Sequence, residues 1–176
     1  MTEADHDDGD DRNASERASR LRSVDVGLSG SLMVVAYSEK RALELVKVWR
    51  TSFEYGVEVV DPHPLEAQLT FLQREVVPQN KLLLVLDGAE GPVAAFIAFS
   101  KEKVAHLYVH IDYQGRGIGK ALLDVAKGES SGRLHLFTFA RNTLARRFYQ
   151  RNGFREIGRG FESEWQLADV EYAWVR

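Results

Sequence analysis

The sequence contains no cysteine among its 176 residues. Disulfide bridges, thiolate nucleophiles and cysteine-based zinc sites are therefore excluded. The five histidines are scattered along the chain and show no metal-ligand spacing, so we expect no metal site. A chain without cysteine is compatible with the reducing cytosol, and we expect a cytoplasmic location.

Long hydrophobic runs and an excess of positive charge are also missing. No apolar run approaches the roughly 20 residues that a membrane helix needs, and the acidic N-terminus does not resemble a secretory signal. The formal net charge is -3, and residues 1–30 hold eight of the acids and four of the arginines. The remainder is close to neutral and offers no broad basic field, so we expect no membrane or nucleic-acid partner.

Residues 1–29 are acidic, polar and poor in large apolar side chains. Such a segment buries too little surface to offset its ordering entropy, so we expect a disordered acidic tail. Residues 30–176 have the length and hydrophobic content of one globular domain.

Apolar periodicity predicts a mixed α/β domain. We expect helices at 39–55, 65–77, 118–127 and 143–151, and strands at 32–37, 81–86, 93–99, 104–111, 134–139, 154–157 and 170–175. Short turns favour an antiparallel meander over residues 81–111. Strand 134–139 follows a helix, so a right-handed crossover and parallel pairing with strand 104–111 are expected. Pro78 is expected to end the second helix.

A turn with alternating glycines separates strand 104–111 from the helix that follows. Gly115, Gly117 and Gly119 allow unusual backbone angles and close approach of a ligand. The amides and the dipole at the start of the next helix favour an anion, and Arg116 and Lys120 add positive charge. The turn therefore predicts a phosphate-binding cradle built mainly from backbone.

Two common phosphate motifs do not fit this turn. A Walker loop requires Ser or Thr after the lysine and a glycine five residues before Gly119, where the chain has Ala121 and Gln114. The dinucleotide fingerprint requires glycine at the position of Lys120. A tight turn that holds no ligand is the structural alternative.

The residues around the turn resemble a known superfamily. Gln114-Gly115-Arg116-Gly117-Ile118-Gly119 follows the strand His106-Leu107-Tyr108-Val109 and is similar to the Q/R-x-x-G-x-G/A motif of GNAT (Gcn5-related) N-acetyltransferases. A second set of residues resembles the N-x-x-A-x-x-F-Y-x-x-x-G-F signature of the same family: Asn142, Ala145, Phe148, Tyr149, Asn152, Gly153 and Phe154. The resemblance covers about residues 32 to 175. Many relatives have proline at the position of Ile111.

The resemblance implies a central, mostly antiparallel sheet that is splayed at the cofactor site and flanked by helices. It implies acetyl transfer from acetyl-CoA to a primary amine by direct attack, without a covalent enzyme intermediate. Residues implied to bind the cofactor are Tyr108, Val109, Gln114, Gly115, Arg116, Gly117, Ile118, Gly119, Lys120, Asn142 and Tyr149. Among them, the backbone of Tyr108 and Val109 is expected to bond the pantetheine arm, and an amide of this strand to stabilise the oxyanion.

The resemblance also suggests catalytic roles. Tyr149 matches a family tyrosine near the cofactor sulfur and is expected to act as general acid, although a tyrosine packed beside Phe148 is the alternative. Asn142 is expected to contact the pantetheine arm and is also a candidate N-cap. Relatives often place a glutamate base on the strand before the turn, where this chain has Lys103. His106 is therefore the candidate base and ranks ahead of His110. A chain of water molecules that carries the proton to bulk solvent is an equally good alternative.

The acceptor is expected between the two early helices and the loop 158–169. Candidate lining residues are Tyr37, Trp49, Phe53, Tyr55 and Trp165, with Glu162 and Glu164 for a cationic amine. The sequence leaves three functions open: acetylation of a small-molecule amine, acetylation of a protein amine, and acyl-CoA binding by a sensor module with little catalysis. A homodimer is allowed, since relatives often dimerise through their late strands.

Overall fold

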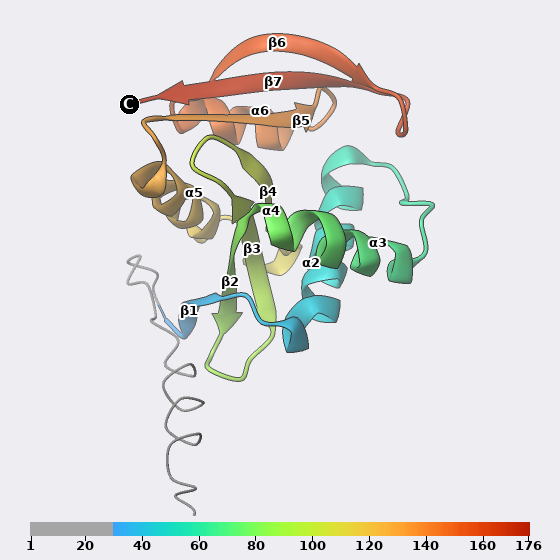
Figure 1. Cartoon of the computed structure of the whole chain (residues 1–176), viewed down its shortest axis with the longest axis vertical. Helices are drawn as coiled ribbons and strands as arrows, with labels where there is room; N and C mark the ends of the chain where they lie inside the picture. The colour runs from blue at the N-terminus through green and yellow to red at the C-terminus, as the bar shows by residue number, and fades with distance from the viewer. Residues whose placement is uncertain (1–29) are drawn as a thin grey trace, which may run out of the picture.

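The computed structural model describes residues 30–176, and the predicted disordered tail 1–29 lies outside them. Two antiparallel sheets and several helices follow one another along the chain (Figure 1). The elements are β1 Leu32–Ala36, η1 Glu39–Arg41, α2 Ala42–Val57, α3 Leu65–Phe71, η2 Leu72–Val76, α4 Val77–Gln79, β2 Lys81–Asp87, β3 Val93–Phe99, β4 Val104–Val109, η3 Ile111–Tyr113, α5 Ile118–Glu129, β5 Arg133–Phe139, α6 Thr143–Arg151, β6 Arg155–Glu162 and β7 Leu167–Val175.

The first sheet has the strand order β1-β2-β3-β4, and the second has the order β5-β7-β6. All pairings within both sheets are antiparallel. The predicted α/β class and antiparallel meander are therefore confirmed. Within residues 30–176, no helix has the length and apolar character needed to cross a bilayer.

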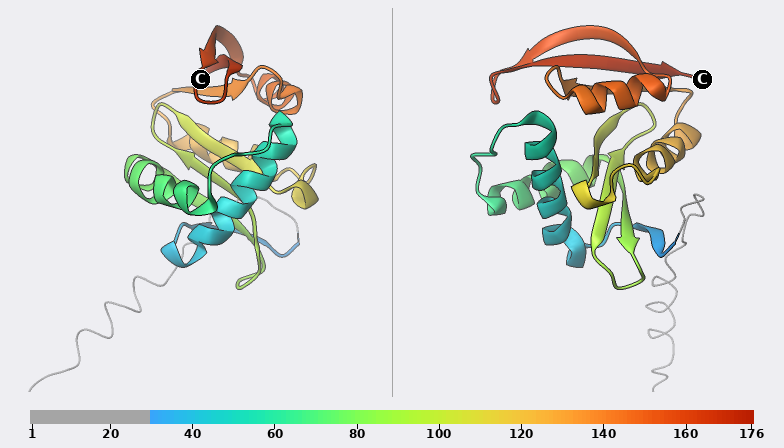
Figure 2. Two further views of the ribbon diagram at one scale, coloured as in Figure 1. Left: turned by 90° about the vertical axis from the view of Figure 1, so that its right-hand side faces the viewer. Right: turned by 180° about the vertical axis from the view of Figure 1, so that it is seen from behind.

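Helices cover both faces of the first sheet. The amphipathic helix α2 packs with α3 and η2 on one face, and α5 packs on the other, as the two further views show (Figure 2). Every residue of β3 is buried, which explains its uninterrupted apolar sequence Val93–Phe99. The two cores meet at this strand, so β3 and its neighbour β4 form a rigid support for whatever binds at the edge of β4.

The expected parallel pairing of β5 with β4 is correct at one bridge only. Lys103 and His135 form an isolated parallel bridge, and the His135 amide donates to the Glu102 carbonyl at 2.9 Å. Beyond this point β5 pairs with β7 over its whole length from Arg133 to Phe139. The two sheets consequently separate between β4 and β5.

Two other expectations were wrong in detail. Pro78 does not end the second helix, because a π-helical turn at Leu72–Val76 leads into α4, where the proline occupies the first turn and needs no N–H bond. The expected loop 158–169 is mostly β6 and β7, and only residues 163–166 form the turn between them. Residues such as Gly158 and Gly160 suggested a loop, but the strand pairing with β7 overrides their propensity.

Candidate active site

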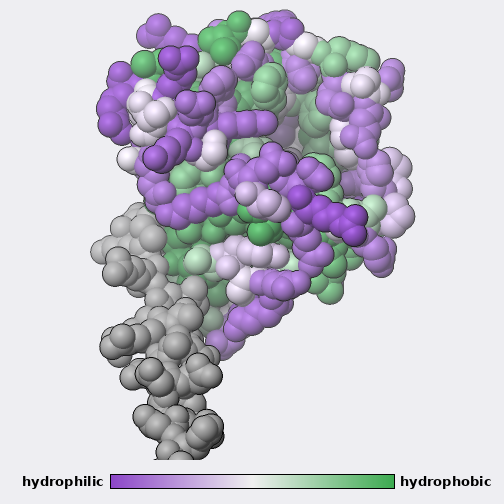
Figure 3. Space-filling model, in the orientation of Figure 1, coloured by the Kyte–Doolittle hydropathy of each residue, from purple (hydrophilic) through white to green (hydrophobic). Residues whose placement is uncertain are grey.

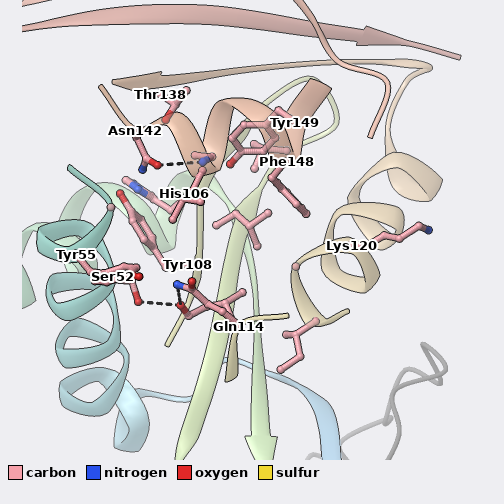
Figure 4. Close-up of a pocket in the computed structure, with 18 of the residues that line it drawn as sticks. Ser52, Tyr55, His106, Tyr108, Gln114, Lys120, Thr138, Asn142, Phe148 and Tyr149 are labelled. Atoms are coloured by element: carbon pink, nitrogen blue, oxygen red, sulfur yellow. Dashed lines mark hydrogen bonds between the residues drawn. The ribbon is translucent and has the colours of Figure 1, made fainter. Parts of the chain in front are cut away.

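A cavity of about 510 Å³ occupies the space where β4 and β5 separate. The space-filling view, in the orientation of Figure 1, shows the opposite face, on which α4 lies in front of the sheet (Figure 3). The cavity is lined by the end of α2, the strands β4 and β5, the glycine turn and helix α6. It therefore collects residues from both sequence motifs, and their side chains converge in the close-up (Figure 4).

The register of β4 decides which of its backbone groups face the cavity. The His110 amide donates to the Ala94 carbonyl at 2.8 Å, and Tyr108 lies opposite Phe96. Because bonded pairs alternate along an antiparallel ladder, the N–H and C=O of Tyr108 point to β3. Those of Leu107 and Val109 point to the open edge. The backbone role expected for Tyr108 therefore moves to Leu107, while Tyr108 contributes its side chain to the cavity wall.

The Val109 carbonyl at this edge already has two partners. The Ser52 hydroxyl donates to it at 3.1 Å from α2, and the Gln114 side-chain amide donates at 3.2 Å from the turn (Figure 4). These bonds fix α2 and the glycine turn to the same point of β4. Sequence reasoning missed Ser52, although a serine on the otherwise apolar buried face of a helix is a detectable signal.

The glycine turn has the backbone geometry that an anion cradle requires. Gly115 and Gly117 have φ of 76° and 80°, a region that L side chains rarely adopt. The first bond inside α5 runs from the Ala121 amide to the Gly117 carbonyl at 3.0 Å. The amides of Ile118, Gly119 and Lys120 precede it and have no partner inside the helix. They are available to an anion at the N-terminal end of the helix dipole.

The two basic side chains of the turn are directed elsewhere. The Arg116 guanidinium donates to the Asp112 carbonyl at 2.9 Å, lies over the Tyr113 ring, and does not line the cavity. The Lys120 ammonium pairs with Asp124, and its side chain points away from the cavity (Figure 4). The cradle is thus formed by backbone N–H groups, with the Lys120 side chain available only after rotation.

Gly119 has a packing role in addition. A Cβ at this position would lie 3.3 Å from Cζ of Phe148 and 3.6 Å from Cγ2 of Val109. The absence of a side chain therefore lets the start of α5 approach both α6 and β4.

Asn142 is the N-cap of α6, as expected, because its side-chain oxygen accepts from the Ala145 amide at 3.0 Å. Its amide nitrogen lies against Gly56 of α2, where an added Cβ would be only 2.7 Å away. The capping bond fixes the side-chain orientation, so that the NH₂ group lies on the cavity wall.

Tyr149 projects into the cavity from α6 (Figure 4). Its ring is buried against Phe154 and Tyr172, as the packing alternative expects, and its hydroxyl points into the cavity (Figure 4). Burial raises the pKa of the Tyr149 hydroxyl above its ordinary value, and the nearby Tyr108 adds to this effect. The hydroxyl therefore keeps its proton at neutral pH and remains a potential donor.

His106 lies on the same face of β4 as Tyr108, and its ring packs against Trp49 at an interplanar angle of 49°, with ring centroids 4.3 Å apart. Burial lowers the pKa of His106 to about 4, and the ammonium of Lys103 contributes. The imidazole is therefore neutral at pH 7, and its burial makes the protonated form unfavourable. His110 instead binds the Asp112 amide through its own ring and caps η3.

The residues expected at the acceptor site divide into two groups. Trp49 and Phe53 are core residues, whereas Tyr55 is half exposed and lines the cavity. Trp165 packs on Phe53 at 4.6 Å and contacts His63, whose ring nitrogens lie 2.8 Å from Asp61 and 3.2 Å from Glu164. Glu164 therefore joins the β6–β7 turn to the α2–α3 connection. Within residues 30–176, no group of three His, Asp or Glu side chains is arranged so that it could hold a metal ion.

Comparison with known proteins gives a consistent match. Residues 79–156 match the family described as the acetyltransferase (GNAT) domain. The chain is 28% identical over 116 residues to the peptidyl-lysine N-acetyltransferase YjaB of Salmonella typhimurium, covering 66% of this chain and 78% of that protein.

Solved structures share the fold. The apo form of YjaB from Escherichia coli superimposes with a TM-score of 0.67 at 20% identity, covering 82% of this chain and 97% of that one. The PaiA N-acetyltransferase of Thermoplasma acidophilum, solved in complex with coenzyme A, gives a TM-score of 0.63 at 17% identity, covering 84% of this chain and 100% of that one.

Proposed function

This chain belongs to the GNAT superfamily of acetyltransferases, and we propose that it transfers the acetyl group of acetyl-CoA to a primary amine by direct attack. The observation that carries this proposal is that one cavity borders two sets of unpaired backbone groups. At one end lie the free amides of the first turn of α5, and along one side lies the open edge of β4.

These features fit the chemistry of the donor. The amides of Ile118 to Lys120 suit a pyrophosphate, because several N–H groups and the helix dipole favour negative charge. The backbone of Leu107 and Val109 suits the amide-containing pantetheine arm, which pairs with a strand edge as another strand would. The Asn142 amide group and the wall formed by Tyr108 complete this part of the site.

The reaction forms a bond between the amine nitrogen and the acetyl carbon and breaks the carbon–sulfur bond. Acetyl-CoA supplies the thioester that makes this exchange favourable. The amine loses one proton, which solvent accepts directly or by way of His106, a weak base because of its lowered pKa, and the departing thiolate gains one from Tyr149. The Leu107 amide at the open edge is suited to polarise the thioester carbonyl.

Both a lysine side chain and a small molecule qualify as acceptor under this proposal. The name of the Salmonella relative, a peptidyl-lysine N-acetyltransferase, supports a lysine acceptor. The cytoplasmic location and the homodimer stay predictions of the sequence.

Calorimetric titration with acetyl-CoA, with ATP and NAD as controls, tests the proposal together with the variant Gly117→Glu. The new carboxylate would occupy the cradle, and the positive φ at this position adds strain. Loss of two charge-assisted hydrogen bonds, at about 1.5–3 kcal/mol each, predicts acetyl-CoA binding weaker by at least about 100-fold. Gly128→Glu, at the exposed far end of the same helix, is the matched control and is expected to bind normally. Unchanged affinity in a folded Gly117→Glu protein would refute the cradle.

A further inference from the structure

A second cavity of about 310 Å³ lies beside the first. It is formed by the end of α3, the turns η2 and α4, and the connection between β3 and β4. Ala105 and His106 line both cavities, so the two spaces lie on either side of the first half of β4. None of the roles described above uses the remaining walls of this second cavity.

The position of the second cavity follows from the direction of β4. The phosphate cradle lies after the end of β4, and the open edge then runs back through Val109 and Leu107 toward Ala105. A donor anchored at the cradle and paired along this edge therefore directs its reacting end toward the start of β4. That is the region where the second cavity begins, so an amine lying there faces the acetyl group next to His106.

The second cavity carries one charge of each sign on different walls. Glu75 comes from η2 and Lys103 from the residue before β4. Over residues 30–176, neither side chain takes part in an ion pair, with each other or with a third residue. Glu75 accepts only a long bond from Gln79 at 3.4 Å. Lys103 is close enough to His106 to influence its ring electrostatically.

We propose that the second cavity binds the acceptor and that the acceptor is a primary amine that also carries a carboxylate, as free amino acids do. This inference rests on the proposed acetyl transfer. The carboxylate of the acceptor pairs with Lys103, and its amine lies between Glu75 and His106. A purely cationic amine would be repelled by the Lys103 ammonium, and the neutral main chain of a peptide would offer that ammonium no partner.

Steady-state kinetics with matched amines test this assignment. Each free amino acid is compared with its carboxamide and with the decarboxylated amine, for example lysine, lysine amide and 1,5-diaminopentane. Lys103 is exposed, and an exposed charge pair is weak, so we expect kcat/KM to be about two- to fivefold higher for the carboxylate form. Lys103→Met should remove this preference while the KM for acetyl-CoA stays unchanged.

Glu75→Gln should lower kcat/KM for every amine without changing the preference for a carboxylate. Lys101→Met is the matched control, because Lys101 is exposed like Lys103 but does not line the cavity, and this variant should retain the wild-type preference. Equal or better acetylation of the amides or of lysine peptides would overturn this inference alone. Failure to acetylate any amine by a protein that binds acetyl-CoA would overturn the proposed enzyme function as well.

Discussion

His106 is expected to make the folded protein less stable in acid. Burial of its ring, with a contribution from Lys103, lowers the pKa of His106 from 6.5 to about 4. Between these two pH values the unfolded chain binds a proton on this histidine and the folded chain does not. The free energy of unfolding therefore falls as the pH falls through this window, and above pH 6.5 the residue contributes no pH dependence.

The pKa difference sets the magnitude. At about 1.4 kcal/mol for each factor of ten in proton affinity, the complete titration of His106 corresponds to ~3 kcal/mol. The ring also lines two cavities, so contact with solvent reduces the effect, and ~3 kcal/mol is an upper bound. Against a stability of roughly 5–15 kcal/mol for an ordinary domain, this loss is easily measured.

The variant His106→Gln isolates the effect. Urea unfolding of both proteins is measured from pH 4 to pH 7.5, and each curve is referenced to its own value at pH 7.5. Carboxylates titrate in both proteins and cancel in the difference, so wild type should lose up to ~3 kcal/mol more than the variant. Lys103→Met should reduce this excess, because the second cause of the lowered pKa is removed. Parallel curves for wild type and His106→Gln would refute a buried, neutral His106.

Two further variants separate chemistry from packing. Tyr149→Phe keeps the buried ring but removes the proton donor. We expect kcat to fall on the order of 100-fold while the Kd for acetyl-CoA, measured by calorimetry, changes little. Equal losses in kcat and in affinity for acetyl-CoA would assign Tyr149 to packing. Asn142→Ala removes the N-cap and should lose about 1 kcal/mol of stability and bind acetyl-CoA more weakly. Asn142→Asp keeps the cap and should show only the weaker binding. An Asn142→Ala protein that is as stable as wild type in thermal unfolding would contradict the capping role.

The sequence predicted the parts of the site that depend on local backbone. The turn Gln114 to Gly119 has the positive φ angles at Gly115 and Gly117 that alternating glycines suggest. Asn142 caps the helix that its position predicted. Both features are determined by residues within a few positions of one another, and such short-range geometry is the kind that sequence patterns record.

Features that depend on pairing between distant segments were harder to predict. Alternation along β4 places Tyr108 and Leu107 on opposite edges, but only the register with β3, fixed by pairs such as Ala98 with His106, shows which edge is open. Lys103 stands at the start of β4, where relatives often have a glutamate base, so the sequence suggested that this base is missing. The place of Lys103 in a second cavity requires the end of α3 and the turn η2, which lie about thirty residues earlier in the chain.

The open edge of β4 connects this fold to its chemistry. An unpaired strand edge inside a protein has a cost, since buried backbone N–H and C=O groups without partners lose about 1–3 kcal/mol each. Here Ser52 and Gln114 satisfy the Val109 carbonyl, and β5 is joined to the start of β4 only by the bridge between Lys103 and His135, since it pairs with β7 instead. A ligand with its own amide groups recovers the hydrogen bonds that the protein leaves unmade, and this recovery favours a pantetheine arm over an apolar chain of similar shape.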